Sequence, residues 1–317
     1  MTSFDFPGKS VIVTGGAGFI GSHLVDELVR VGARVTVLDN LSSGNKKNLE
    51  SSWNEIRFIE GDVRNEDTLE KILEGQDLVF HLAASASVPN SVENPKMDYH
   101  TNSTGTFNIL NLARRVDVEK IIYASTAAVY GEPVYTPIDE DHPLNPISPY
   151  GASKVSAERM VYAFGENYGI PYTIFRIFNV YGPRQRKYVM YDFIKKLKDD
   201  PTELEVLGDG NQVRDFCYVE DATKAFLLAV EDDNGVYNLA GDSLIEIGEL
   251  AELIVSKISP EAEIHYTGES WEGDIKKLIP DNTKIKEKLG FKEETPLELG
   301  IEKLVRWFEE VEPIQDD

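Results

Sequence analysis

The sequence predicts an α/β fold, in which a doubly wound parallel sheet is followed by a smaller second α/β domain. Three observations support this prediction. Short β-branched and apolar runs alternate with helical patterns over residues 11–177. A glycine-rich turn joins the first strand to the first helix. Beyond Pro183 the regular alternation of strand and helix ends, as expected where a second domain begins.

The composition indicates a large acidic protein that binds neither nucleic acid nor membranes. The 317 residues are 41% hydrophobic, enough for a core shared by two domains around one cleft. A net charge of −23 disfavours nucleic acid or an anionic membrane as partner, and no apolar run reaches the ~20 residues of a membrane span. The single cysteine, Cys217, precludes an internal disulfide, and the first residues lack a signal-peptide pattern. We therefore expect a cytoplasmic protein, and we predict no metal site.

Residues 11–32 form the first strand, turn and helix of the predicted sheet. Four β-branched residues at 11–14 predict a buried strand, and apolar residues recur at helical spacing from Ile20 onward. The turn between them contains Gly15, Gly16, Gly18 and Gly21, and the last three satisfy the G-x-G-x-x-G dinucleotide fingerprint. Such glycines allow backbone N–H groups and the positive helix N-terminus to approach a pyrophosphate. We therefore expect the diphosphate of a dinucleotide at this turn.

An acidic residue follows the second strand. The strand at residues 34–38 delivers Asp39 about 20 residues after the glycine turn. A carboxylate there can accept both hydroxyls of an adenosine ribose and would repel a 2′-phosphate. The sequence therefore predicts NAD rather than NADP. The polar turn at residues 40–44 either closes over the adenosine or is a simple loop.

The third, fourth and fifth strands are predicted at residues 56–59, 77–84 and 120–125. The third ends in Gly61-Asp62-Val63, which places Asp62 at the cofactor crevice, where it meets the adenine amino group, caps the next helix, or does both. The fourth ends in small residues, where the backbone passes near the pyrophosphate. Residues 94–115 read as one long helix that contains Asn102 and Gly105.

The clearest chemical signal is the pair Tyr150 and Lys154. Ser148 can cap a helix and Pro149 suits its first turn, so the pair falls one turn apart on the same face. A tyrosine phenol, with a reference pKa near 10, is a poor base at neutral pH. The lysine ammonium and a positive nicotinamide ring can lower that pKa by about three units, or roughly 4 kcal/mol, in a water-poor cleft. Tyr150 is therefore predicted to be a general base.

The remaining chain is predicted to supply one more strand at the nicotinamide and most of the second domain. The sixth strand covers residues 172–182, and a helix at 220–230 and a strand at 235–239 follow later, with further helices at 247–258 and 297–310. Four basic side chains lie beyond Pro183, where the regular alternation ends, namely Arg184, Arg186, Lys187 and Arg214. They could clamp a substrate diphosphate or be solvated surface charges.

With these motifs, the chain resembles the extended short-chain dehydrogenase/reductase family over nearly its whole length. The motifs are Gly15-Gly-Ala-Gly-Phe-Ile-Gly21, Asp39-Asn-Leu-Ser-Ser-Gly44, Gly61-Asp-Val63, Ser125-Thr-Ala-Ala-Val-Tyr-Gly131, Tyr150-Gly-Ala-Ser-Lys154, Arg176-Ile-Phe-Asn-Val-Tyr-Gly-Pro183 and Arg214-Asp-Phe-Cys-Tyr-Val-Glu-Asp221. Within that family it looks most like the NAD-dependent nucleotide-sugar epimerases, the UDP-glucose 4-epimerases above all. The resemblance implies a discontinuous architecture: a Rossmann domain of residues 1–180 and 215–240, and a nucleotide-sugar-binding domain of residues 181–214 and 241–317.

The resemblance also implies the site residues. Catalysis falls to Thr126, Tyr150 and Lys154. Contacts with NAD are expected from Gly15, Gly18, Phe19, Ile20, Gly21, Asp39, Asn40, Ser43, Gly44, Asp62, Val63, Ala83, Ala84, Asn102, Tyr150, Lys154 and Ile177. Contacts with the substrate, a UDP-hexose, are expected from Ser87, Thr126, Asn179, Leu207, Arg214, Asp274 and Leu278. The family pairs helices across a two-fold axis, which predicts a homodimer.

The choice of reaction depends on Ala127 and Ala128. In the related dehydratases this stretch carries Asp and Glu, and in the glucuronate decarboxylases it carries Glu, whereas both places are alanine here. This difference favours epimerisation at C4, with a dehydratase, a decarboxylase or a catalytically silent NAD-binding redox sensor as alternatives.

Departures from the family pattern affect the substrate assignment. Trp271 replaces an arginine that many relatives place near the diphosphate, and Leu207 replaces an aromatic ring that often stacks on uracil. The segment Ser85-Ala-Ser-Val-Pro89 lacks a lysine that some epimerases carry. Leu278, four residues after Asp274, is expected near the sugar C2 substituent, and its intermediate size predicts some tolerance for N-acetylated sugars.

Overall fold

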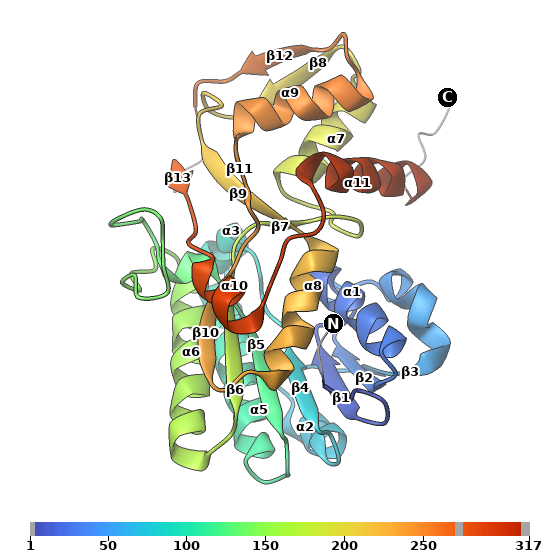
Figure 1. Ribbon diagram of the computed structural model, residues 1–317, viewed down its shortest axis with the longest axis vertical. Coiled ribbons are helices and arrows are strands. Elements are labelled where there is room, and N and C mark those ends of the chain that lie inside the picture. Colours follow the sequence, from blue (N-terminus) through green and yellow to red (C-terminus); the bar gives the residue numbers. More distant parts are fainter. Residues whose placement is uncertain (1–3, 270–274, 312–317) are drawn as a thin grey trace.

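The computed structural model describes residues 4–269 and 275–311, and a large parallel sheet forms its lower half in Figure 1. The sheet has seven strands in the order β10-β6-β5-β4-β1-β2-β3, all paired in parallel. Their bounds are β1 (Ser10–Thr14), β2 (Arg34–Asp39), β3 (Ile56–Glu60), β4 (Leu78–His81), β5 (Lys120–Thr126), β6 (Tyr172–Ile177) and β10 (Gly235–Leu239). The order reverses between β1 and β4, which places a ligand crevice at the carboxyl ends of these strands. The predicted doubly wound Rossmann fold is confirmed.

Alternate residues of each strand serve the two faces of the sheet. On β1, Val11 and Val13 join one apolar cluster with α1 (Phe19–Arg30) and α8 (Val219–Leu228). Ile12 joins the other, with α2 (Glu66–Leu73), α5 (Gly105–Ala113) and α6 (Pro149–Tyr168). Both faces are covered, which is why these strands are continuously apolar.

The second lobe, at the top of Figure 1, is built around shorter strands. A four-stranded sheet contains β7 (Val180–Tyr181), β9 (Val213–Tyr218), β11 (Ser243–Glu246) and β13 (Lys277–Leu278), and a parallel pair contains β8 (Glu203–Val206) and β12 (Glu263–Tyr266). The helices of this half are α7 (Val189–Asp199), α9 (Ile247–Ile258), α10 (Thr283–Leu289) and α11 (Leu297–Val311). No helix in the described part of the chain is long and apolar enough to cross a bilayer.

The two lobes share one apolar core. The cluster that contains Val11 and Leu24 continues through Phe216 and Tyr218 of β9 to Leu250 of α9. The segment at 215–240 begins in the small sheet with β9 and ends in the large sheet with β10. It therefore connects the lobes by packing as well as by the chain.

Two local expectations from the sequence differ from the structure. The long helix expected at 94–115 is α4 (Pro95–Tyr99), a π-helical turn η2 (His100–Thr104) and α5. The helix that follows Asp62 is capped by Asn65, whose side chain accepts the Thr68 N–H, so Asp62 is not its N-cap. The remaining short elements are α3 (Val88–Glu93) and the 3₁₀ segments η1 (Lys46–Glu55), η3 (Ala127–Val129) and η4 (Ala229–Glu231).

Candidate active site

The glycine turn after β1 is shaped by close backbone contacts. Gly15 has φ of +73°, and a Cβ there would lie 2.7 Å from the Ala83 nitrogen. A Cβ on Gly21 would lie 2.2 Å from the Gly15 carbonyl oxygen, so only glycine lets α1 start this close to the turn. The N-terminus of α1 has no side-chain cap and no acidic residue in its first turn. Its backbone N–H groups therefore fit the diphosphate of a dinucleotide.

Asp39 lies at the carboxyl end of β2, beside the glycine turn. It is 7% exposed, and its two carboxylate oxygens accept the backbone N–H groups of Ala17 and Leu41, at 2.9 and 2.8 Å. Burial raises the pKa of Asp39, and these two hydrogen bonds oppose the shift. A Cβ on Gly44 would lie 2.8 Å from Asp39 Oδ1, so the 40–44 turn packs directly onto this carboxylate. The arrangement fits an adenosine ribose next to Asp39.

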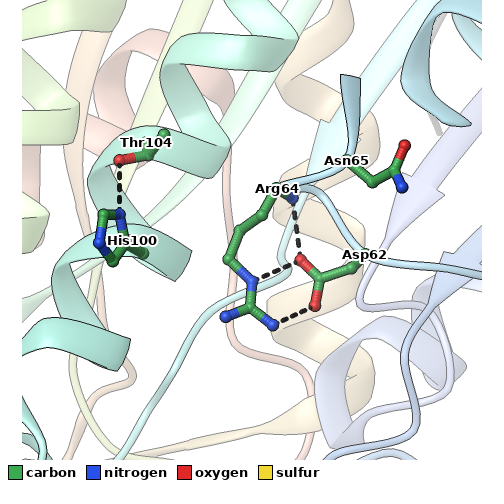
Figure 2. A pocket seen from close by; sticks show the side chains of 5 residues that line it. All are labelled: Asp62, Arg64, Asn65, His100 and Thr104. Carbon is green, nitrogen blue, oxygen red and sulfur yellow. Dashed lines mark hydrogen bonds and ion pairs between the residues drawn. The ribbon is translucent and has the colours of Figure 1, made fainter. Parts of the chain in front are cut away.

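Asp62 lies at the adjacent strand end, beside a cavity of about 520 Å³ lined by Asp62, Arg64, Asn65, His100 and Thr104 (Figure 2). The Arg64 guanidinium donates two hydrogen bonds to the Asp62 carboxylate, the Arg64 backbone N–H donates a third at 2.9 Å, and Asn40 donates a fourth at 2.8 Å. These donors, the Arg64 guanidinium first, lower the pKa of Asp62 to about 2. The cavity lies at the end of the crevice where the adenine is expected and includes none of the predicted catalytic residues.

Tyr150 and Lys154 lie in the first two turns of α6, facing the end of β5. Ser148 caps this helix by accepting the Gly151 N–H, as predicted. Burial raises the pKa of Tyr150 well above its usual value, the opposite of the direction expected from the sequence, and a hydrogen bond with the Thr126 hydroxyl lowers it in part. The Lys154 Nζ donates to the Ala124 carbonyl oxygen at 2.6 Å. The structure therefore brings the three predicted catalytic residues together.

The buried surroundings of Lys154 make its ammonium group easier to deprotonate. Lys154 is 2% exposed, and burial lowers its pKa to about 7. Its Nζ lies 4.3 Å from the centre of the Tyr123 ring. His81 lies buried nearby, hydrogen-bonded to Thr14 and Thr106, and burial followed by the Lys154 charge lowers the pKa of His81 to about 3. His81 is therefore neutral and does not compete for protons at physiological pH.

A buried ion pair anchors α6 to the sheet. Glu158, one turn after Lys154, pairs with Arg176 of β6 at 3.0 Å, with side chains 3% and 5% exposed. Ser125, the residue before Thr126, donates a 2.5 Å hydrogen bond to the same Glu158 carboxylate. Removing one partner of such a pair would leave an uncompensated buried charge. The pair therefore keeps α6 aligned with the end of β5.

Apart from Thr126, the predicted substrate residues that the structure describes come from the N-cap of α3, from β9 and β13, and from the loops after β6 and β8. Ser87 caps α3, Asn179 donates to the Asp215 carbonyl oxygen, and Leu207 is exposed before a glycine turn. Arg214 lies on β9 opposite Leu278 of β13, and its guanidinium donates to the Val213 carbonyl oxygen at 2.9 Å. Asp274 and Trp271 lie outside the described residues.

Two of the four basic residues, Arg184 and Arg186, have partners on α1 and α11. Arg184 forms an ion pair with Asp26 on α1, in the other lobe. The Arg186 guanidinium lies over the ring of Trp307 on α11, 5.6 Å from its centre. These positions correct the expectation that Arg184 and Arg186 join Arg214 at a diphosphate.

Sequence reasoning missed three residues around the Tyr150–Lys154 pair. Asp98 and Ser153 are buried beside it and bond to each other. Tyr188 lies in the loop before α7, with φ of 74°, and donates to the Ala86 carbonyl oxygen at 3.2 Å. Ser153 lies inside the Tyr-x-x-x-Lys motif, which was the one available signal. Asp98 and Tyr188 are distant in sequence and carry no local pattern.

Comparison with known proteins agrees with this geometry. The family model for the NAD-dependent epimerase/dehydratase family matches residues 11–240. A putative UDP-glucose 4-epimerase of Methanocaldococcus jannaschii is 42% identical over 94% of this chain and 97% of its own. A UDP-glucuronic acid decarboxylase of Danio rerio is 36% identical over 95% of this chain and 72% of its own.

Two solved structures are similar over nearly the whole chain. The UDP-glucose 4-epimerase of Thermotoga maritima with UDP-glucose has a TM-score of 0.90 and 39% identity, covering 95% of this chain and 99% of that one. The UDP-N-acetylglucosamine 4-epimerase of Methanobrevibacter ruminantium, in complex with UDP-N-acetylmuramic acid, has a TM-score of 0.90 and 38% identity, covering 95% and 98%. The chain therefore belongs to the NAD-dependent nucleotide-sugar epimerase/dehydratase family of extended short-chain dehydrogenases, and its cofactor is NAD.

Proposed function

We propose that this protein is a nucleotide-sugar 4-epimerase that interconverts UDP-glucose and UDP-galactose through a 4-keto sugar. The observation that carries the proposal is the environment of Tyr150. The Thr126 hydroxyl and the Lys154 side chain of α6 lie beside Tyr150. The two residues after Thr126, Ala127 and Ala128, have only methyl side chains. Such a site can move a proton and a hydride at C4 but offers no acid there for eliminating water from C5 and C6.

In this mechanism Tyr150 is the general base for the sugar 4-hydroxyl. NAD held at the glycine turn and Asp39 would supply the hydride chemistry at C4, oxidation to the ketone and reduction back to the alcohol. Tyr150 accepts the hydroxyl proton as a phenolate, and Thr126 hydrogen-bonds the same oxygen. Lys154, whose ammonium is desolvated, stabilises that phenolate and would hold the nicotinamide ribose of NAD. Because the ketone must rotate, the diphosphate is held firmly and the sugar loosely.

Residues of the second lobe set the substrate class in this proposal. Arg214 holds the diphosphate from β9. Leu278 is half-buried against the apolar cluster that contains Ala127 and Phe178, which supports a position near the sugar. A leucine of intermediate size would accept glucose and galactose and tolerate some N-acetylated sugars. Asp274 and Leu207 are proposed to contact the substrate on the family's pattern.

We also propose a homodimer in the cytoplasm. The helices α4, α5 and α6 present apolar side chains on their outer surface, and those exposed by 40% or more are Met97, Tyr99, Phe107, Tyr162 and Tyr168. Phe107 on α5 contacts Phe164 on α6 edge-on, so the two helices form one apolar face. A two-fold pairing would cover this face without leaving a free copy of it. Light scattering at micromolar concentration should give the mass of a dimer, and a monomer mass would reject this interface.

Two alternative functions make different demands on the site. A dehydratase or decarboxylase would need an acid near C5, and the acid that acts electrostatically on Tyr150, Asp98, is buried in hydrogen bonds to Ser153 and Asn102. A catalytically silent redox sensor would not need Thr126, Tyr150 and Lys154 to be held together. Both alternatives are therefore disfavoured.

One experiment separates these reactions. Purified protein is incubated with a panel of UDP-sugars deuterated at C4, and the products are followed by NMR. The proposal expects C4 inversion, with deuterium kept at C4 and no net consumption of NAD. Exchange of the deuterium with solvent, loss of water or loss of carbon dioxide would assign a different reaction. Recovery of unchanged sugar from every member of the panel would favour the sensor.

A further inference from the structure

A buried polar cluster lies beneath the first turns of the catalytic helix. It consists of Asp98 from α4, Asn102 from the π-helical turn η2 and Ser153 from α6, with exposed fractions of 1%, 1% and 3%. The Ser153 Oγ lies 2.5 Å from Asp98 Oδ1, and the Asn102 Nδ2 lies 3.1 Å from Asp98 Oδ2 and 3.0 Å from Ser153 Oγ. Three elements therefore meet at one carboxylate.

The hydrogen-bond capacity of these groups gives each a definite role. Ser153 has one hydroxyl hydrogen, and its shortest contact is with Asp98, so it donates there and accepts from Asn102. The Asn102 Oδ1 accepts the Ser85 N–H at 2.8 Å, and the two hydrogens of its Nδ2 are shared among the Asp98 and Ser153 oxygens and the Ser85 carbonyl oxygen at 3.2 Å. Asn102 thereby joins the loop after β4 to α6. The π turn supplies the extra residue that points this amide inward, as such turns often do at functional sites.

The Asp98 carboxylate is an expensive group to place here. A buried charge costs several kcal/mol unless its surroundings compensate for it, and an asparagine could accept the same serine hydrogen without a charge. Burial does raise the pKa of Asp98, and the hydrogen bonds from Ser153 and Asn102, with the Lys154 charge, oppose that shift. The carboxylate also acts electrostatically on Tyr150 and Lys154. Its charge therefore bears on both members of the proton-transfer pair.

We propose that Asp98 is a positioning residue for the Tyr150–Lys154 pair. Through Ser153 and Asn102 it keeps the start of α6 and the Ser85 loop in register, and it places a fixed negative charge beside the Lys154 ammonium. The inference rests on the proposed function only in taking Tyr150 and Lys154 as the acid–base pair.

The charge has a defined consequence for the pair. The other titratable groups that act on Tyr150 or Lys154 are Glu158 on α6, His81 on β4, Tyr123 on β5 and Tyr188 before α7. Tyr150 and Lys154 together lose their first proton in one macroscopic step. A fixed negative charge favours the protonated pair, so removing it lowers the pH of that step, whichever residue releases the proton. Asp98 thus sets the pH at which the phenolate forms.

The test compares two variants of Asp98 with a matched control. Asp98→Asn removes the charge, Asp98→Glu keeps it but displaces the contacts, and Glu93→Gln removes an exposed charge from the neighbouring α3. The acid limb of the pH–rate profile should move to lower pH by about half a unit or more in Asp98→Asn. It should stay in place in Asp98→Glu, which should lose kcat about ten-fold, and Glu93→Gln should match the unmodified protein.

A second measurement needs no substrate. The ultraviolet titration of tyrosinate in NAD-loaded protein is recorded with and without Tyr150→Phe, and the difference isolates Tyr150. Asp98→Asn should shift this difference to lower pH in the same direction as the acid limb. If the protein has no epimerase activity, the proposed function fails while this titration still tests the inference. An unshifted Tyr150 titration in Asp98→Asn, or unchanged kcat in Asp98→Glu, would overturn the role of Asp98.

Discussion

Arg184, in the loop between β7 and α7, forms an ion pair with Asp26 on α1, with Nη2 2.6 Å from Oδ2. The same Asp26 accepts hydrogen bonds from Ser51 and Ser52 of η1. His23, one turn earlier on α1, contacts the Pro183 carbonyl oxygen at 2.9 Å, and burial lowers its pKa to about 4. A neutral histidine and a half-buried ion pair thus join the second lobe to the helix that follows the glycine turn.

This contact distinguishes Arg184 from Arg214 in a pair of variants. Arg184→Ala should lower the free energy of unfolding by about 1 to 2 kcal/mol, because Asp26 loses a charged donor, and should leave KM for UDP-glucose nearly unchanged. Arg214→Ala should raise KM with little effect on kcat, as expected for an interaction made equally in ground and transition states. Thermal melts and steady-state kinetics on both variants check this. A raised KM in Arg184→Ala alone would restore Arg184 to the diphosphate site.

Removal of the general base is the most direct test of the chemistry. Tyr150→Phe should lose about 10² to 10⁴ in kcat and keep its NAD, because the phenol acts on a proton while other groups hold the cofactor. Thr126→Ala should lose less, since one hydrogen bond to a charged group is worth about 1.5 to 3 kcal/mol. Steady-state rates with released NAD measured after denaturation give both quantities. Equal losses in the two variants would contradict the assigned roles.

Cofactor preference should depend on Asp39. Asp39→Ala removes the carboxylate that would accept the ribose hydroxyls and repel a 2′-phosphate, so NAD binding should weaken and NADP should improve relative to NAD. Asp39 also accepts the Ala17 and Leu41 N–H groups, so Asp39→Asn serves as a control that keeps an acceptor. Calorimetric titration of both cofactors into stripped protein measures the ratio. Equal affinity of the unmodified protein for NAD and NADP would contradict the assignment.

Stability should fall with rising pH because of two buried carboxyls. Burial raises the pKa of Asp215 to about 6 and that of Glu293 to about 7, and each has one buried oxygen that finds no hydrogen-bond partner among residues 4–269 and 275–311. A raised acid pKa means that the folded state binds the proton more tightly. The stabilisation from proton binding at these two carboxyls is therefore present near pH 4 and is lost as pH rises through about 6 to 7.

The prediction is tested by comparing Asp215→Asn with the unmodified protein at several pH values. Asp215→Asn keeps an acceptor for the Gly241 N–H and removes the titration. Relative to the unmodified protein, its free energy of unfolding should improve by about 1.4 kcal/mol as pH rises from about 5 to 8, because the folded-state pKa of about 6 lies about one unit above pH 5. Glu310→Gln, at an exposed position on α11, controls for the change in net charge. A constant offset between Asp215→Asn and the unmodified protein across this range would contradict the shift.

Sugar selectivity should respond to the size of residue 278. Leu278→Tyr should reduce turnover of UDP-N-acetylglucosamine more than turnover of UDP-glucose, because a ring would occupy the space proposed for the N-acetyl group. Leu278→Ala should change the ratio in the opposite direction. The ratio of kcat/KM for the two sugars measures the effect. If neither variant changes that ratio, Leu278 is an ordinary packing residue.

Features with local signals could be predicted from the order of the residues alone. The glycine turn, Asp39 at the next strand end, and the Ser148 cap that places Tyr150 and Lys154 on one face all depend on spacings within one strand–helix unit. Continuous apolar strands separated by helical patterns likewise predicted the parallel sheet. The physical reason is that backbone sterics, capping and periodicity act over a few residues and are visible in the order of the chain.

Which distant residues meet depends on how the chain packs. Asp98 and Ser153 are 55 positions apart, and Asp26 and Arg184 are 158 apart, so neither pair leaves a pattern in the sequence. Asn102 lies in the π turn and bonds to Ser85 and Ser153, contacts that do not follow from helical propensity. Arg184 could be assigned to a diphosphate only until its partner on α1 was known. Burial and partner choice are properties of the packed chain, and they determine the charge and the role of each ionisable group.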